Sequence, residues 1–239
     1  MYLGSLVQVY ETGPCSLYLI QTISLCVLTP FDVPLQFNFS VYFLNSWSPL
    51  YYSERHSLKP DEIGIHLMLP HLFNLFVKMF VSKPLFAALQ HPSGYCRFTL
   101  LACRRFFTVV GFLGSTVSMV VLALNSTAAN DGADGAGGGR DGVWLTTACF
   151  TVAMGFVALH PSGFKANYMD LTLNSSGLLS GVGNTLASAG AYVGPLVVGH
   201  ILQQYKSWAL VYYTIGATSV LTAAVFGLCS QVEPVDKED

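Results

Sequence analysis

Long apolar stretches without a charged residue dominate this chain. Such stretches cover residues 106–130, 143–164, 171–205 and 207–232. A helix needs about 20 mainly apolar residues to cross the hydrocarbon of a bilayer, and each stretch is that long or longer. Together with two further apolar runs near the N-terminus, the pattern predicts six membrane spans, at approximately 33–52, 63–81, 106–125, 143–159, 176–203 and 208–230.

These spans predict an all-α, polytopic membrane protein, because a lipid-exposed segment must satisfy its backbone hydrogen bonds internally. The bundle is expected over residues 33–231, with a flexible glycine- and aspartate-rich loop at 126–142. Residues 1–32 form an N-terminal segment in which a weak extra helix is one interpretation, and residues 232–239 form an acidic tail.

Composition supports this class and excludes others. The chain has 239 residues, of which 52% are hydrophobic and only 10% are charged, whereas soluble domains carry about 25% charged residues. The net charge of −2 and the lack of a basic run argue against a nucleic-acid partner. No order of Ser, His and Asp, no metal-ligand spacing and no paired carboxylates indicate catalysis, so we expect no enzyme, cofactor or metal site.

The distribution of lysine and arginine predicts the orientation. Cytoplasmic loops carry an excess of these residues. Placing the loop between the second and third spans inside gives seven cations inside and four outside. The inner set is Lys78, Lys83, Arg97, Arg104, Arg105, Lys165 and Lys237, and the outer set is Arg55, Lys59, Arg140 and Lys206. Arg97 and Lys165 are therefore expected on one side of the membrane and Gly137 on the other.

Several motifs are shared with one transporter family. They are NFSVYFLNSWSPLYY (38–52), LPHL (69–72), RRF with GFLG (104–106, 111–114), GFKANYMD (163–170), GVGN followed by Pro195 and Gly199 (181–184), and Trp208 followed by VYY (211–213). In these residues the chain resembles the anion:cation symporters of the major facilitator superfamily. That family includes the vesicular glutamate carriers, sialin, the type I sodium/phosphate cotransporters and plant plastid anion carriers.

The resemblance covers about residues 33–231 and corresponds to the second, C-terminal six-helix half of a twelve-helix carrier. It implies secondary transport of an organic or inorganic anion, such as phosphate or a glutamate-like carboxylate, coupled to protons or sodium. The binding site would lie at the midplane between two halves. The chain departs from the family at Phe37, where the glutamate carriers have a basic residue, and at 86–89, where the family's acidic residue is missing.

Polar residues within the spans are candidates for the substrate path. They are Asn38, Tyr42, Asn45, His71 and Asn184. The residues of the first span recur at helical spacing and are expected to line a cavity or another helix. His71 is either a proton-coupling group, because histidine titrates near neutral pH, or a hydrogen-bonded interior residue, which is the default. For Asn184, a substrate contact and a helix-to-helix hydrogen bond are both open, and its amide is expected to face the bundle or the cavity rather than lipid.

The candidates for a gate or hinge are Arg104, Arg105, Asn167, Asp170, Gly181 and Pro195. Asn167 and Asp170 are three residues apart and share a helical face. For Asp170 we favour a structural role, as a helix cap or as the partner of Lys165. Two small-xxx-small pairs, at 177–181 and 190–194, allow close helix approach, and Pro195 is a potential kink.

Two functions therefore follow from the sequence. One is an anion carrier whose partners are the bilayer, a small anion with its co-transported ion, and a second half or protomer. The other is a half-length membrane protein without transport activity, such as an assembly partner or a truncated gene product. Plastid, vesicular and plasma membranes are all compatible with the resemblance.

Overall fold

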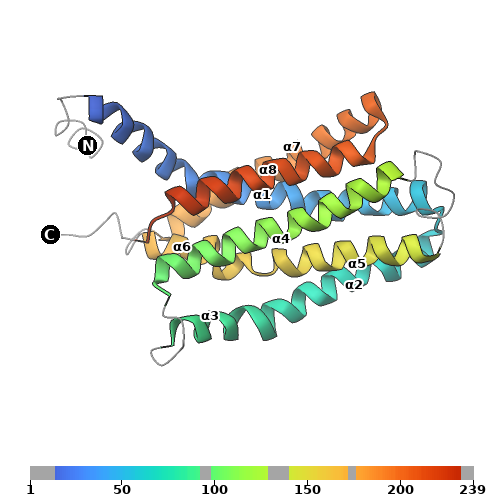
Figure 1. Ribbon diagram of the computed structural model, residues 1–239, viewed down its shortest axis with the longest axis horizontal. Helices are drawn as coiled ribbons and strands as arrows, with labels where there is room; N and C mark the ends of the chain where they lie inside the picture. The colour runs from blue at the N-terminus through green and yellow to red at the C-terminus, as the bar shows by residue number, and fades with distance from the viewer. Residues whose placement is uncertain (1–13, 92–97, 129–139, 172–175, 233–239) are drawn as a thin grey trace.

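The computed structural model describes residues 14–91, 98–128, 140–171 and 176–232, and every regular element within them is helical (Figure 1). The helices are α1 (Pro14–His56), α2 (Pro60–Phe76), η1 (Val77–Ser82), α3 (Lys83–Gln90), α4 (Leu100–Ala128), α5 (Arg140–Val157), η2 (His160–Ser162), α6 (Phe164–Leu171), α7 (Ser176–Tyr205) and α8 (Trp208–Cys229). The all-α fold is thereby confirmed.

Within the described residues, five helical segments are long and apolar enough to cross a membrane, namely Pro60–Gln90, Leu100–Thr127, Arg140–Leu171, Ser176–Tyr205 and Trp208–Cys229. They correspond to five of the six predicted spans. The remaining span, 33–52, is helical within α1 but is not one of these five. Six polar side chains between positions 36 and 48 lower its hydropathy, namely Gln36, Asn38, Ser40, Asn45, Ser46 and Ser48.

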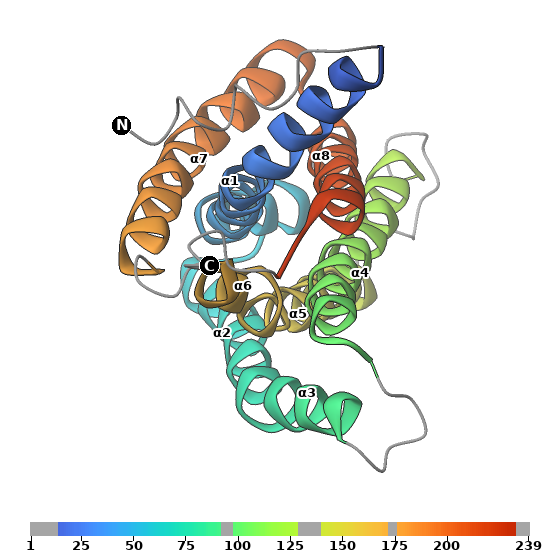
Figure 2. The ribbon, with the colours of Figure 1, turned by 90° about the vertical axis from the view of Figure 1, so that its left-hand side faces the viewer.

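The bundle is built around α1. Phe43, Tyr51 and Tyr52 of α1 are buried with Phe150 of α5 and Tyr212 of α8 in the main apolar core. Figure 2 looks along the bundle and shows α1 between α7 and α8, with α3 projecting to one side. The helix pairs that contact each other most extensively are α4 with α8, α1 with α7, α4 with α5 and α2 with α5. The outer surface carries many exposed apolar side chains, which suits contact with lipid.

Two of the long segments change their helix type, and prolines explain both changes. Pro84 has no N–H for the carbonyl four residues earlier, and the preceding turn, η1, is a π-helix that joins α2 to α3. Pro161 lies in η2, where the helix that began as α5 is interrupted before α6. A Cβ on Gly163 would lie 2.3 Å from Oγ1 of Thr108, so only glycine lets α4 approach this break so closely.

Some predicted boundaries need correction. Residues 14–32 are helical and continuous with the first span, so they form no separate helix. The predicted loop 126–142 is shorter, because α4 continues to Ala128 and α5 already begins at Arg140. Residues 129–139, Arg97, Gly137 and most of the acidic tail lie outside the described residues. The topology prediction for Arg97 and Gly137 therefore stays a prediction.

Candidate functional site

The exposed face of α1 carries the predicted polar residues. Asn38, Tyr42 and Asn45 follow one another at intervals of four and three residues and so share one helical face. Asn38 is half-buried, whereas Tyr42 and Asn45 are exposed. The opposite face of α1 holds the buried aromatic core, which fixes the rotation of the helix. This rotation directs the polar face of α1 away from the core.

A crevice between α1, α2 and α5 brings Asn45 and His71 together. It is lined by Leu44, Asn45, Ser48, Leu67, Pro70, His71, Phe150 and Met154. Its free volume is ≈ 10 Å³, which is roughly the space of one water molecule. His71 is exposed at this crevice, and its two interpretations, as a proton-coupling group and as a hydrogen-bonded interior residue, both stay predictions. Asn74, one turn further along α2, takes the interior position and donates a hydrogen bond of 2.6 Å to the carbonyl of Met154.

The predicted orientation defines an inner end of the bundle, where α6 lies beside the start of α4. Here Arg104 forms a two-point ion pair with Asp170, with nitrogen–oxygen distances of 2.7 and 3.3 Å. The same guanidinium donates a 2.7 Å hydrogen bond to the carbonyl of Ser162 at the helix break. The Ser162 hydroxyl also bonds Ser82 of η1 at 2.7 Å. We call Arg104, Asp170, Ser162 and Ser82 the inner network.

The ion pair corrects the expected partner of Asp170. Its carboxylate pairs with Arg104, and the ammonium of Lys165 instead lies 4.7 Å from the ring centre of Phe37. Lys165 and Asp170 are five residues apart, so in one helix they do not share a face. A cation–π contact is therefore made at the position where the family resemblance expected a basic residue.

Arg105 and Asn167 occupy different surroundings from the inner network. Arg105 donates hydrogen bonds of 3.0 and 2.9 Å to the hydroxyl and carbonyl oxygens of Ser230, just after α8 ends. It therefore holds the C-terminus of α8, where a cation is favoured by the helix dipole. Asn167 is buried on α6, and its side-chain oxygen has no hydrogen-bond partner in the described part of the chain.

The two glycine pairs of α7 have different surroundings. A Cβ on Gly190 would lie 2.4 Å from the carbonyl oxygen of Leu35, and one on Gly194 would lie 2.9 Å from the ring of Phe39. This pair lets α7 approach α1 closely. Gly181 and its partner Gly177 face open space. Pro195 lies inside α7, which the structure assigns as one helix from Ser176 to Tyr205.

Asn184 is exposed on α7. Its neighbour Gly183 faces the bundle and contacts the hydroxyl of Tyr168, whereas the side chain of Asn184 has no hydrogen bond to any residue that the structure describes. The structure therefore does not place the amide against another helix of this bundle, because Asn184 is one position, or about 100°, away from the packed face of α7.

The other end, the outer end, contains a polar network that the sequence analysis missed. His56 Nε2 lies 3.0 Å from Oγ1 of Thr146. Oγ1 of Thr147 is 2.8 Å from both the Tyr52 hydroxyl and Nδ1 of His66. We call these five residues the outer network. The sequence signal for it was the Thr146–Thr147 pair at the start of a span.

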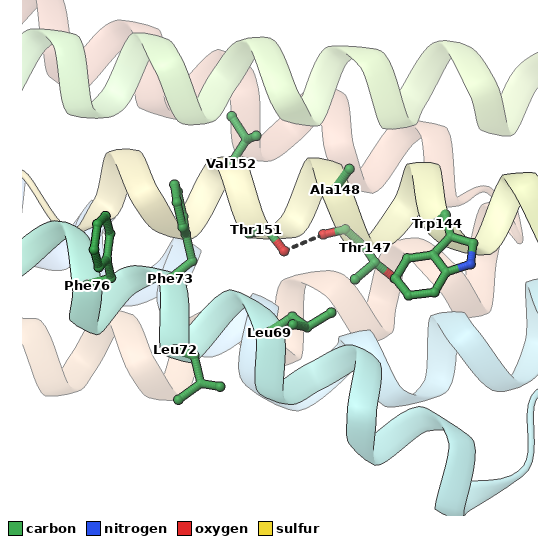
Figure 3. A pocket seen from close by; sticks show the side chains of 9 residues that line it. All are labelled: Leu69, Leu72, Phe73, Phe76, Trp144, Thr147, Ala148, Thr151 and Val152. Atoms are coloured by element: carbon green, nitrogen blue, oxygen red, sulfur yellow. Dashed lines mark hydrogen bonds between the residues drawn. The ribbon is translucent and has the colours of Figure 1, made fainter.

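A larger hollow between α2 and α5 has a different character (Figure 3). This groove of ≈ 520 Å³ is lined by Leu69, Leu72, Phe73, Phe76, Trp144, Thr147, Ala148, Thr151 and Val152. Its two threonine hydroxyls are already bonded, since that of Thr151 donates to the backbone carbonyl of Thr147 at 2.7 Å and that of Thr147 donates to the carbonyl of Val143 at 2.9 Å. The groove therefore suits hydrocarbon, and the polar crevice at Asn45 and His71 is the candidate functional site.

Comparison with known proteins agrees with the motifs. No family model matches the chain. Curated relatives include probable anion transporter 7 of Oryza sativa subsp. japonica (24% identical), probable anion transporter 5 of Arabidopsis thaliana (27%) and human sialin (25%). The chain is a homologue of the anion:cation symporters. The plant matches cover 83% of this chain, and the sialin match covers 82%.

The chain spans less than half the length of these relatives, with shares of 43% and 44% for the plant proteins and 37% for sialin. The relatives are transporters, which agrees with the expectation of a non-enzymatic protein. Together with the five apolar helices, they show that this symporter homologue is an integral, multi-pass membrane protein.

Proposed function

We propose that this chain forms one half of a secondary carrier for small anions, with its part of the substrate path on α1 and α2. The observation that carries the proposal is the exposed polar face of α1, which meets His71 in one crevice with Asn45. Polar groups in membrane spans are costly toward lipid and mark substrate paths when they line a cavity. The names of the relatives, which include anion transporters and a putative inorganic phosphate cotransporter, support an anion as substrate.

The chemistry of this face fits a second half that contributes hydrogen bonds rather than charge. Asn38, Tyr42 and Asn45 offer amide and hydroxyl donors, and His71 is the titratable side chain that lines the crevice. Full cations for the anion would come from the other half, as the family resemblance implies. Asn184 is exposed on α7 and is our candidate for an additional contact across the interface between the halves.

Coupling to a proton or sodium ion is part of the proposal. His71 is the candidate proton carrier, because imidazole can both accept and release a proton and the side chain is open to the crevice. The inner network is the candidate gate, since it joins α4 to the break between α5 and α6. Gly181 and Pro195 of α7 are candidate hinge positions for the rocking of the bundle.

The second candidate function is a half-length membrane protein without transport activity of its own. The chain spans 43% of its rice relative, and substrate in such carriers binds between two repeats. A half that is not joined by a second one would insert into the membrane and present the α1 face without transporting. In that case the chain is an assembly partner or a truncated gene product.

Transport assays on reconstituted vesicles would distinguish the two candidates. The chain alone, and the chain co-expressed with the first six helices of a plant relative, would be tested for uptake of labelled phosphate and glutamate. We expect uptake with the added half and a loss of about tenfold in Asn45→Ala or His71→Gln. His200→Gln is the matched control, because His200 is exposed on α7 away from the crevice. No uptake in either preparation would reject the carrier function.

A further inference from the structure

A second polar pocket opens at the outer end of the bundle, between the end of α1, the start of α2 and the start of α5. It has a volume of ≈ 400 Å³ and is lined by His56, Leu58, Glu62, Ile65, His66, Arg140, Val143 and Trp144. This volume lies within the range of small-molecule sites. The polar residues of this pocket are separate from Asn45 and His71, which line the crevice.

Arg140 supplies a positive charge that the described residues leave unpaired. No hydrogen bond or ion pair joins its side chain to any part of the chain that the structure describes, and it lies at the first position of α5, where the helix dipole also favours an anion. The acidic residue that lines the pocket, Glu62, is already engaged, because its carboxylate accepts a 3.3 Å hydrogen bond from the backbone N–H of Lys59. The lining thus holds one cation and one carboxylate, and of the two only the Arg140 guanidinium is without a bond to the described residues.

His56 provides an independent sign of a missing partner. Only 9% of this residue is exposed, and its Nε2 is used in the bond to Thr146, but Nδ1 has no hydrogen-bond partner among the described residues. Buried polar atoms without a partner are rare, and a bound molecule or water is one of their explanations. Because His56 also lines the pocket, a ligand there can reach this nitrogen.

The remaining walls are apolar or aromatic. The rings of His66 and Trp144 meet edge to face with their centres 5.1 Å apart, and both line the pocket with Ile65. Nδ1 of His66 is hydrogen-bonded to Oγ1 of Thr147, so the ring of His66 mainly offers a ligand its face for van der Waals contact. A ligand that fills the pocket would therefore place an apolar or aromatic body against these rings and its charge near Arg140.

We propose that this outer pocket binds a small organic carboxylate. Arg140 pairs with the carboxylate, His56 donates a hydrogen bond to it through Nδ1, and Trp144 with His66 contacts the body of the ligand. Ligand binding at this site does not depend on transport, so it can be tested independently of the carrier function proposed above.

The proposal implies that acid strengthens binding. Burial lowers the pKa of His56 from its usual value, and the charge of Arg55 and the ring of His66 lower this pKa further. The other charged groups that line the pocket are Arg140 and Glu62. A carboxylate beside Nδ1 favours the protonated ring, so proton and ligand bind cooperatively. Affinity should rise as the pH falls from 7.5 to 6.0, where carboxylic acids stay ionised.

Calorimetric titration of the chain in lipid nanodiscs with benzoate would test the site, with the neutral isostere benzamide as the chemical control. We expect benzoate to bind and Arg140→Gln to weaken it about tenfold, which corresponds to the ~1.4 kcal/mol of one charge-assisted hydrogen bond. Lys206→Gln is the matched control, because Lys206 is an exposed cation at the same end outside the pocket. Equal binding of benzamide and benzoate, or unchanged affinity in Arg140→Gln, would overturn the proposal.

The His56→Gln variant tests the second contact. Its amide can still bond Thr146, but it cannot be protonated, so benzoate affinity should no longer rise between pH 7.5 and 6.0. A pH-dependence equal to that of the unmodified chain would show that His56 takes no part. If either variant fails to fold, the comparison of benzoate with benzamide at both pH values on the unmodified chain still decides whether the pocket recognises charge.

Discussion

The two ends of the bundle are held together by different chemistry. At the inner end, a guanidinium and a carboxylate join α4 to α6, and the same guanidinium bonds a free carbonyl at the helix break. At the outer end, hydrogen bonds between imidazole and hydroxyl groups and between two hydroxyl groups join α1, α2 and α5. Charge-assisted hydrogen bonds are about twice as strong as neutral ones, so the two ends differ in strength and in their response to acid.

This difference shows how a membrane protein with few charges can make one end of its bundle more stable than the other. Arg104 is close to the cation-rich loop that the orientation rule places inside. The outer network uses side chains that lose their bonds at little cost, since each neutral bond contributes only about 1 kcal/mol. We therefore expect the outer end to open more readily than the inner end.

Removal of the inner cation should have the largest effect. Arg104→Gln leaves the Asp170 carboxylate without its partner at a site where its side chain is only 16% exposed. The free energy of unfolding in detergent should fall by about 3 kcal/mol, the lower limit for breaking a buried pair. Lys83→Gln, an exposed cation after η1, is the control and should change little. A loss below about 1 kcal/mol would mean that the pair behaves as a surface ion pair.

A methyl group at the helix break should have the next largest effect. In Gly163→Ala the new Cβ would lie 2.3 Å from Oγ1 and 2.9 Å from the backbone nitrogen of Thr108. Relief requires movement of α4 and should cost about 2 kcal/mol. Gly64→Ala near the outer end meets nothing within 4 Å and should stabilise α2 by about 0.5 kcal/mol. Thermal unfolding of both variants measures the two changes in stability. Equal changes in Gly163→Ala and Gly64→Ala would contradict the predicted clash with Thr108.

Loss of one hydroxyl should weaken the outer end modestly. Tyr52→Phe removes the 2.8 Å bond to Thr147, which retains its bond to His66 and its own helical carbonyl. We expect a loss of about 1 kcal/mol. Tyr42→Phe on the exposed face of α1 is the control and should have no measurable effect. If Tyr52→Phe cost as much as Arg104→Gln, the two ends would not differ in strength.

The smallest expected effect is a pH-dependence specific to the outer end. Because burial lowers the pKa of His56 in the folded protein, the neutral ring is favoured by folding. Its contribution is complete above the unfolded pKa of about 6.5 and decreases as the pH falls through that value toward the lower folded pKa. In the absence of ligand, the melting temperature should fall between pH 7.5 and 5.5, and this fall should be smaller in His56→Gln. An equal fall of the melting temperature in both proteins would show that His56 is not the source of this pH-dependence.

The sequence predicted most of the fold, because membrane spans depend on local composition. Among the described residues, five of the six predicted spans lie in helices that are long and apolar enough to cross a membrane. The polar face of α1 was also predictable, since Asn38, Tyr42 and Asn45 follow the period of a helix. These features depend on residues that are close together in the chain.

The pairings between helices were not predictable in the same way. Asp170 has Lys165 five residues away in sequence, yet it pairs with Arg104, which is 66 residues away. Likewise, nothing local distinguishes Gly190, which contacts α1, from Gly181, which faces open space. Partner choice depends on how each helix is rotated in the bundle, and a small rotation exchanges buried and exposed positions.

The polarity of α1 has a consequence for synthesis of the protein. Its span is the first in the bundle, and six polar side chains between positions 36 and 48 lower the hydropathy of that span. Helices enter the bilayer individually according to their hydrophobicity, so this one should be held poorly when it leaves the ribosome. Its close neighbour α7 begins only at Ser176. The helix that packs on the first span is therefore synthesised more than a hundred residues later. We expect stable insertion of α1 to require that translation continues through α7.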